Sequence, residues 1–374
     1  MGQPPEMRKP PLLRRIRDYY AEGFPQRSEF APGIRGNIGY AAAVFRDMPE
    51  GLRRLMRFQP FLALATGLIC IFLLRAGFEY IPVVVTFLSL SLVFIFARLH
   101  LVRNTSHLLV IKISDFVVQY AIGNILLFIL PFYLESTTFL SRNSLFAFLV
   151  LFLTILGNWD ELYQKWVLEH PLIGAVYYGL TFFATLNFIF PVIFGMRNIW
   201  SLALSGALSV LIVLFFVYPK ALLFKEKRLT IYVIAATAII LSAIWFGRSF
   251  IPPAPLKLTR ATSCAGIGDK EPKESFRSVE EAELDWAYFF TAVFAPLGLS
   301  EGLRHIWYYD GKKVSEIELN KIKGGRAEGY RTWSRHKLRE GTGKYRIEVW
   351  TEGGQLLGEG GFEVVKASPP IEKK

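Results

Sequence analysis

The sequence predicts an α-helical transmembrane bundle of about seven spans, followed by a small all-β, immunoglobulin-like antiparallel sandwich. Two observations support this prediction. The first two thirds of the 374-residue chain contain apolar runs of about twenty residues with few charges, long enough to cross a hydrocarbon core of ~30 Å. The last third instead consists of short β-rich runs broken by Gly or Pro.

Composition divides the chain into five segments. We predict a basic cytoplasmic N-terminal segment with amphipathic helices, a transmembrane helix bundle, a Pro-rich linker, a periplasmic β-sandwich and a tail. In the same order, these segments cover residues 1–58, 59–248, 249–284, 285–366 and 367–374. N-terminal runs such as "PPLLRRIRDYY" carry basic polar faces, which suit the anionic cytoplasmic leaflet of a membrane.

The apolar runs define the expected spans. These are residues 60–78, 80–98, 116–134, 143–158, 172–194, 200–218 and 229–247. The fourth is the shortest, and its ends are the least defined. After it, "WDELYQKWVLEHP" repeats apolar residues at helical spacing from Trp159 to Val167. We expect an interfacial helix there, with its aromatic rings at headgroup level, or alternatively a helix that docks a partner.

The distribution of Lys and Arg predicts the orientation. Residues 1–248 contain 23 Lys and Arg against 13 Asp and Glu, whereas residues 249–374 contain 20 against 18. Basic residues collect before the first span and in alternate loops, while the other loops carry the single residues Arg75, Arg142 and Arg197. The positive-inside rule therefore places the N-terminus in the cytoplasm and, after an odd number of spans, the C-terminal domain in the periplasm. The same distribution argues against nucleic-acid binding.

No motif in the sequence indicates a reaction. The chain lacks a phosphate-binding Gly loop, HExxH, CxxC and GxSxG, and its histidines show no metal-site spacing, so we expect neither cofactor nor metal. No Asp or Glu falls in the middle of a predicted span, which argues against an ion-coupled carrier. The intramembrane polar candidates are Gln119, Asn124 and Asn187. They are interpreted as hydrogen-bonding groups between helices, or alternatively as part of a polar pocket.

The predicted linker begins where the last span ends. Three prolines in "SFIPPAPLKL" prevent the helix from continuing, and a stretch rich in charge, Ser and Pro follows. Cys264 lies in this stretch and Cys70 lies in an apolar run, so the two are not expected to form a disulfide. Cys264 is expected to be unpaired or buried, or alternatively to pair with another chain.

From about Asp285 onward the hydrophobic pattern has a period of two, and the runs are those of short strands. Asp310-Gly311 and the "EGG" at 352–354 indicate turns between strands. Strands and turns at this spacing are typical of an immunoglobulin-like sandwich. Because such strands can bury a core among themselves, we expect a fragment from about Glu280 to Lys366 to fold without the bundle.

The run "GYRTWSR" leaves open which side of the predicted strand faces the core. In a strand, Arg331, Trp333 and Arg335 point to one side and the residues between them to the other. We expect Trp333 to be a core residue whose edges are covered by the arginine stems. The alternative is an outward indole between two guanidinium groups, which stacks on a sugar or holds an anionic polymer. The binding candidates are therefore Arg331, Trp333, Arg335 and His336.

The C-terminal pattern also resembles a known family. The residues that carry the resemblance are Ala295 to Leu299, His305, Trp307, Gly311, Trp333, Ser334, and Gln355 to Val364. Together they resemble the bacterial family called domain of unknown function 2914, with one departure at Tyr345, where that family favours Trp. The resemblance implies a bacterial membrane protein, because a multi-span region commonly precedes this domain, and it implies no reaction.

We therefore hypothesise a non-enzymatic inner-membrane protein that displays a periplasmic β-sandwich. The sandwich would bind an envelope glycan, polymer or protein, with the lipid bilayer as the other partner and homo-oligomerisation left open. The alternative is a membrane enzyme or transporter component that acts on a lipid-linked substrate, with the sandwich as its regulatory domain. A polar cavity reached by Asn124 and Asn187 would favour the alternative, and a tightly packed bundle would favour the first hypothesis.

The orientation can be tested with single cysteines at Ser106, Lys225 and Ser315 in a Cys-free background. An impermeant thiol reagent added to intact spheroplasts should label only the Ser315 variant, because the other two positions lie in Lys- and Arg-rich loops. Labelling at Ser106 or Lys225 would overturn the assigned orientation.

Overall fold

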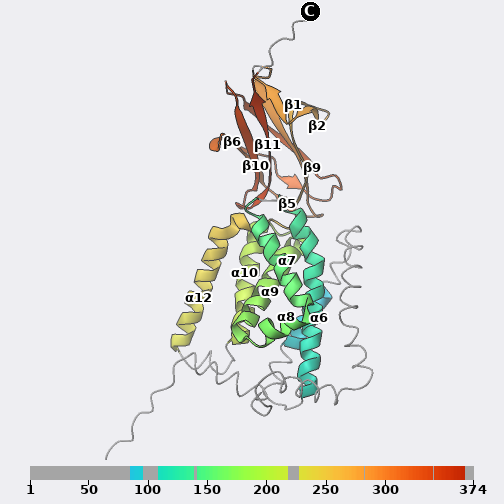
Figure 1. Cartoon of the computed structure of the whole chain (residues 1–374), viewed down its shortest axis with the longest axis vertical. Coiled ribbons are helices and arrows are strands. Elements are labelled where there is room, and N and C mark those ends of the chain that lie inside the picture. Colours follow the sequence, from blue (N-terminus) through green and yellow to red (C-terminus); the bar gives the residue numbers. More distant parts are fainter. Residues whose placement is uncertain are drawn as a thin grey trace, which may run out of the picture.

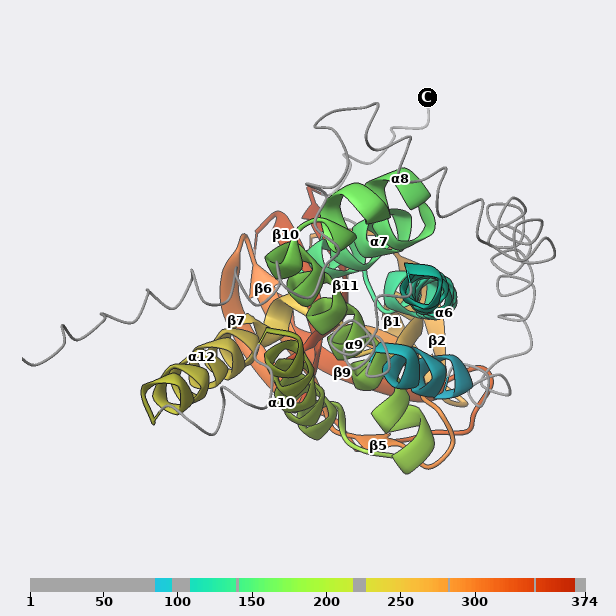
Figure 2. The same ribbon diagram turned by 90° about the horizontal axis from the view of Figure 1, so that it is seen from below.

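The computed structural model places a helix bundle at one end of the long axis and a C-terminal β domain at the other (Figure 1). It describes residues 85–95, 108–138, 141–217, 227–281, 283–339 and 341–366. The predicted N-terminal segment, the first span, Cys70 and the tail lie outside these residues. In both views α12 (Lys227–Phe246) stands apart from most of the other helices (Figures 1 and 2).

Apolar helices form the bundle around large buried side chains such as Tyr133, Phe182 and Phe188. Its elements are a helix at Val85–Ile95, α6 (Leu108–Glu135), α7 (Ser144–Asn158), α8 (Asp160–Leu162), the π-helical η3 (Tyr163–Leu168), α9 (Pro171–Phe194), α10 (Asn198–Val217), α12 and the 3-10 turn η4 (Gly247–Phe250). Proline begins α9, where its missing N–H leaves no intrahelical bond unmade. Gly195 ends α9 in the left-handed conformation, with φ of 59°.

Fewer helices are able to cross a membrane than the sequence predicts. Among the described residues, two helices are long and apolar enough, Asp115–Glu135 within α6 and Leu172–Phe194 within α9. A third is added if α7 and the α8–η3 segment, which meet at 92°, form one broken span. The expectation of about seven spans is therefore not supported. Val85–Ile95, Asn198–Leu214 and Thr237–Phe250 are shorter apolar stretches within the described residues, and the first predicted span lies outside them.

The bend after α7 shapes the end of the bundle that faces away from the β domain (Figure 1). Tyr163 and Val167 of η3 are buried in the bundle, while Trp159 and Trp166 are exposed. The apolar stripe expected in this segment is thus shared between the bundle core and the outer surface.

The β domain contains two main sheets. Its strands are β1 (Lys257–Gly268), β2 (Glu271–Phe276), β3 (Ser278–Glu280), β4 (Trp286–Phe294), β5 (Ser300–Glu301), β6 (Leu303–Tyr309), β7 (Lys312–Glu318), β8 (Ile322–Lys323), β9 (Tyr330–Lys337), β10 (Gly343–Thr351) and β11 (Leu356–Val365). One sheet has the order β2-β1-β4-β9, the other has the order β3-β11-β10-β6-β7, and β5 pairs with β8. All pairs are antiparallel except β3 with β11.

Both main sheets contribute to one core, which contains Phe289 of β4, Trp307 of β6, Ile347 of β10 and Phe362 of β11. The predicted hairpin at Asp310-Gly311 is confirmed. Asp310 and Gly311 have φ of 45° and 78°, and they connect β6 to β7 in the two-residue form that matches the twist of paired strands.

The segment expected to be a linker is largely structured. Residues 257–280 form β1, β2 and β3, and β1 lies inside its sheet between β2 and β4. The sequence does not reveal β1, because few of its residues are fully buried and apolar and polar residues do not alternate along it. A fragment that begins at Glu280 lacks β1, so the expectation that it folds alone loses its basis.

Candidate functional site

Trp333 lies on the outer side of β9, and its expected core position is wrong. Arg331, Trp333 and Arg335 do share one side of the strand, as predicted, but Trp333 is 38% exposed while Thr332 and Ser334 are buried. The inner space opposite β9 is occupied by Trp307, whose Nε1 donates to Ser334 Oγ at 3.0 Å. A second indole does not fit there, so the small Ser334 faces inward.

The two arginines beside Trp333 differ in their surroundings. Arg331 forms ion pairs with Glu271 at 2.8 Å and Glu328 at 2.6 Å. The Arg335 guanidinium instead lies 5.0 Å from the centre of the Trp286 ring. Across the described part of the chain no carboxylate lies within ion-pair distance of Arg335. Among the described residues, Arg335 is therefore the arginine of this pair that lacks an ion pair.

His336 does not share this surface. It lies on the inner side of β9, half-buried, with its ring 5.4 Å from that of Trp307 and 6.3 Å from that of Tyr345. Burial lowers the pKa of His336, and the charge of Arg339 adds to that effect. It is the one member of the predicted binding set that the structure separates from the other three.

Two hollows adjoin the outer edge of β9. One has a volume of about 790 Å³ and lies between the end of β7 and the start of β9, where Leu319, Arg326 and Tyr330 contribute to its lining. The other, of about 530 Å³, is lined in part by Tyr288 and Arg335. Ile317 and Trp333 line both, so the two hollows adjoin along the strand. This set of Trp333, Arg335 and the two hollows is referred to below as the β9 groove.

A buried polar group ties β9 to the core. His305 is buried, with Nδ1 2.8 Å from Ser334 Oγ and Nε2 3.2 Å from Thr291 Oγ1. Burial lowers the pKa of His305 from 6.5 to about 3, so the ring is neutral at ordinary pH. His305, Trp307 and Ser334, which carry the sequence resemblance, therefore join β6 to β9.

Cys264 is a free, buried thiol on the outer side of the same sheet, where it packs with Phe290. Burial raises its pKa. These surroundings leave no support for the alternative that Cys264 pairs with another chain.

The intramembrane candidates bond between and within helices. Gln119 donates to Asp160 Oδ1 at 2.8 Å and to the Gly157 carbonyl at 3.3 Å, which links α6 to the bend after α7. Asn187 donates to Tyr133 Oη at 3.3 Å, which links α9 to α6. Asn124 donates to the Tyr120 carbonyl of its own helix at 2.7 Å. The structure does not bring these three side chains together into one site.

The sequence did not reveal the junction between the bundle and the β domain. Glu301 of β5 is buried, accepts a hydrogen bond from the Asn198 backbone N–H at 3.0 Å and lies 3.8 Å from Arg197. Burial raises the pKa of Glu301, and the Asn198 N–H and the Arg197 charge oppose that rise. Arg197 also pairs with Glu352 at 2.8 Å. One loop of the bundle is thereby bound to β5 and to the turn between β10 and β11.

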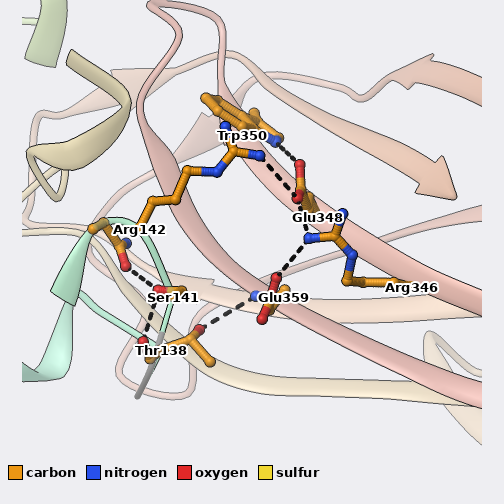
Figure 3. Close-up of polar contacts among 8 residues, drawn as sticks. Thr138, Ser141, Arg142, Arg346, Glu348, Trp350 and Glu359 are labelled. Atoms are coloured by element: carbon orange, nitrogen blue, oxygen red, sulfur yellow. Dashed lines mark hydrogen bonds and ion pairs between the residues drawn. The ribbon is translucent and has the colours of Figure 1, made fainter. Parts of the chain in front are cut away.

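A second loop of the bundle meets the outer face of β10 and β11. Buried Asn143 donates to the Leu356 carbonyl at 2.7 Å. Arg142 reaches the buried Glu348 carboxylate at 4.0 Å, while Arg346 and Trp350 reach the same group from β10 at 2.6 and 2.9 Å (Figure 3). The only sequence signal for these contacts was that Arg142 and Arg197 stand singly in loops otherwise poor in basic residues.

Among the described residues, no group of three His, Cys, Asp or Glu side chains is arranged to hold a metal ion.

Two protein-family models match most of the chain. A family described as a family of unknown function (DUF5924) matches residues 40–290, which is more than half of the chain. The chain belongs to the DUF5924 family. A second family, described as a protein of unknown function (DUF2914), matches residues 300–364 and confirms the resemblance stated above. Searches among curated proteins and among solved structures found no match.

The boundary between these matches falls inside the β domain. The DUF5924 match ends at residue 290, within β4, and the DUF2914 match begins at residue 300, at β5. The sheet that carries the β9 groove therefore takes β1 and β2 from the first match and β9 from the second.

The position of Trp333 predicts a contrast with Trp307. Trp307→Ala should lower the free energy of unfolding of the β domain by about 3–5 kcal/mol, because it removes a fully buried indole and leaves a cavity. Trp333→Ala should lower it by about 1 kcal/mol or less, because the indole is largely outside the core. Calorimetry of the full-length protein in detergent micelles measures both. Equal losses for the two variants would contradict the outward placement.

The burial of His305 predicts a pH dependence. Because its pKa is lower in the folded than in the unfolded chain, the unfolded state binds the extra proton first as the pH falls. Stability should be complete above pH ~6.5 and decline toward pH ~3 by about 1.4 kcal/mol per pH unit. His305→Gln, which keeps a donor and an acceptor but does not titrate, should remove this contribution in pH-dependent melting curves. An unchanged slope in the variant would refute the assignment.

Proposed function

We propose that this chain is a non-enzymatic, multi-pass inner-membrane protein of a bacterial envelope. In this proposal its C-terminal domain, an immunoglobulin-like sandwich, lies in the periplasm and binds an envelope component through the β9 groove. That component is an extended molecule, whether glycan, polymer or protein. The observation that carries the proposal is the outward Trp333 beside Arg335, which has no ion pair in the described part of the chain, at the two hollows.

The outer surface of the bundle supports membrane insertion. Large apolar side chains point away from the protein on several helices, including Leu172, Phe194 and Trp200, which are 73%, 66% and 65% exposed. In water these large side chains would leave apolar surface exposed on several helices, whereas lipid solvates it.

The proposed orientation is supported by the loops that contact the β domain. Arg142 and Arg197 are the basic residues of the two short loops at that end, and both engage carboxylates of the β domain. Basic residues in periplasmic loops run against the positive-inside rule, and here each has a local partner.

Close packing of the bundle favours a binding protein over a membrane enzyme or transporter component. A Cβ added to Gly157 would lie 2.2 Å from Tyr177 Oη, and one added to Gly179 would lie 2.5 Å from Val213 Cγ2. Helices that approach this closely leave little room for a lipid-linked substrate between them. The side-chain amides of Gln119 and Asn187 donate hydrogen bonds to neighbouring helices, as expected of a closely packed bundle.

Photo-crosslinking in intact cells tests the proposal. A benzophenone side chain in place of Asn320, which lines the larger hollow, should form an adduct with an envelope component. The same side chain in place of Lys344, exposed on the other sheet, should not. Trp333→Ala combined with Arg335→Ala should remove the adduct at position 320. The absence of any adduct specific to position 320 would refute the proposed function.

A further inference from the structure

The two main sheets have four edges, and three of them are protected against pairing with another strand. β2 contains Pro272 and a non-glycine residue with positive φ, Glu274. β3 is only three residues long. The pairing of β7 with β6 is interrupted by a register shift at Trp307 and Tyr308. Prolines, short strands and bulges are the usual ways in which proteins prevent unwanted pairing at an edge.

The fourth edge, β9, lacks these protections. It is eight residues long, contains no proline and pairs with β4 in an unbroken register from Tyr330 to Lys337. Within the described chain no strand pairs with its outer side. In an antiparallel edge strand, alternate residues direct their N–H and C=O groups outward, so β9 presents a regular row of backbone donors and acceptors.

The hollows lie along this backbone row. Trp333 and Ser334 point to opposite sides of the sheet, yet both line the smaller hollow. Thr332 and Trp333, which also point to opposite sides, both line the larger one. The smaller hollow also touches Tyr288 of β4 on the outer side and Ile317 of β7 in the other sheet, so it runs from the outer side of β9 past its edge. Space for a ligand is therefore available beside the backbone of β9, and the indole of Trp333 borders both parts of it.

We propose that the β9 edge binds an extended polypeptide segment of a partner protein, which adds to the sheet as a further strand. This inference rests on the proposed function and names its partner class. Side chains two residues apart in a bound strand are about 6.6–6.8 Å apart on the same face. One such pair occupies the two hollows on either side of Trp333, while main-chain bonds to β9 provide affinity.

Charge specifies one side chain of the partner. Arg335 is the charged residue of the smaller hollow, and it has no ion pair in the described part of the chain. Arg331, by contrast, is already paired with Glu271 and Glu328. The bound segment therefore carries Asp or Glu at the smaller hollow, two residues from a side chain that occupies the larger, more mixed one.

A display library tests this inference on the full-length protein in lipid nanodiscs. The probe is a library of random linear peptides of about nine residues, enough to cover the length of β9 at ~3.3 Å per residue. We expect enrichment of sequences with Asp or Glu at a fixed position. Arg335→Gln should weaken the enriched peptide at least about tenfold. Arg331→Gln should change its affinity by less than about threefold, because that guanidinium is already neutralised.

N-methylation separates main-chain pairing from side-chain contacts. Methyl groups on alternate amides of the enriched peptide should abolish binding when they face β9 and leave it largely intact when shifted by one residue. Equal effects of the two methylation patterns, or no enrichment at all, would overturn the inference.

The composition of the crosslinked adduct at position 320 separates failure of this inference from failure of the proposed function. An adduct whose added mass is a different protein agrees with the inference. An adduct whose added mass is removed by glycosidases, or one made of two copies of this chain, overturns it and leaves the proposed binding function in place.

Discussion

The arrangement of the molecule depends on burying the Glu301 carboxylate at the junction of its two parts. A carboxylate without water needs compensating donors and charge, and here the Asn198 N–H and Arg197 provide them from the α9–α10 loop. Separating the parts would expose those groups and break the Asn143 bond to β11 as well. Hydrogen bonds and ion pairs between the two parts therefore contribute to the orientation of the β domain on the bundle.

The junction also changes how the two family matches are understood. A domain boundary at residue 290 or 300 would divide one sheet, because β1 and β4 pair along most of their lengths and β4 continues the sheet to β9. The core of the β domain takes Phe289 and Val293 from before residue 300, and Trp307 and Ile347 from after it. In this chain the last part of the first matched region and the whole of the second build one β domain above the helices.

The sequence allowed the local features of the β domain to be predicted, but not the side of β9 that is buried. Alternation along β9 shows that Arg331, Trp333 and Arg335 share a side, since the period of a strand is two. It does not show which side faces inward. That depends on Trp307, which is distant in sequence and already fills the space opposite Ser334. The Asn143 and Glu301 contacts were invisible for the same reason, because they join residues more than a hundred positions apart.

The segment that runs from α12 through η4 to β1 determines how the β domain is attached to the helices. Residues 251–256 are all buried, and the Gln355 side chain donates to the Ile251 carbonyl at 3.1 Å. The segment that connects the helix to β1 is therefore packed against the protein along its length. A domain on a flexible linker would instead take many positions and orientations relative to the membrane helices. This anchoring fixes the direction in which β9 faces relative to the helices, and under the proposed function a partner would reach β9 from that one direction.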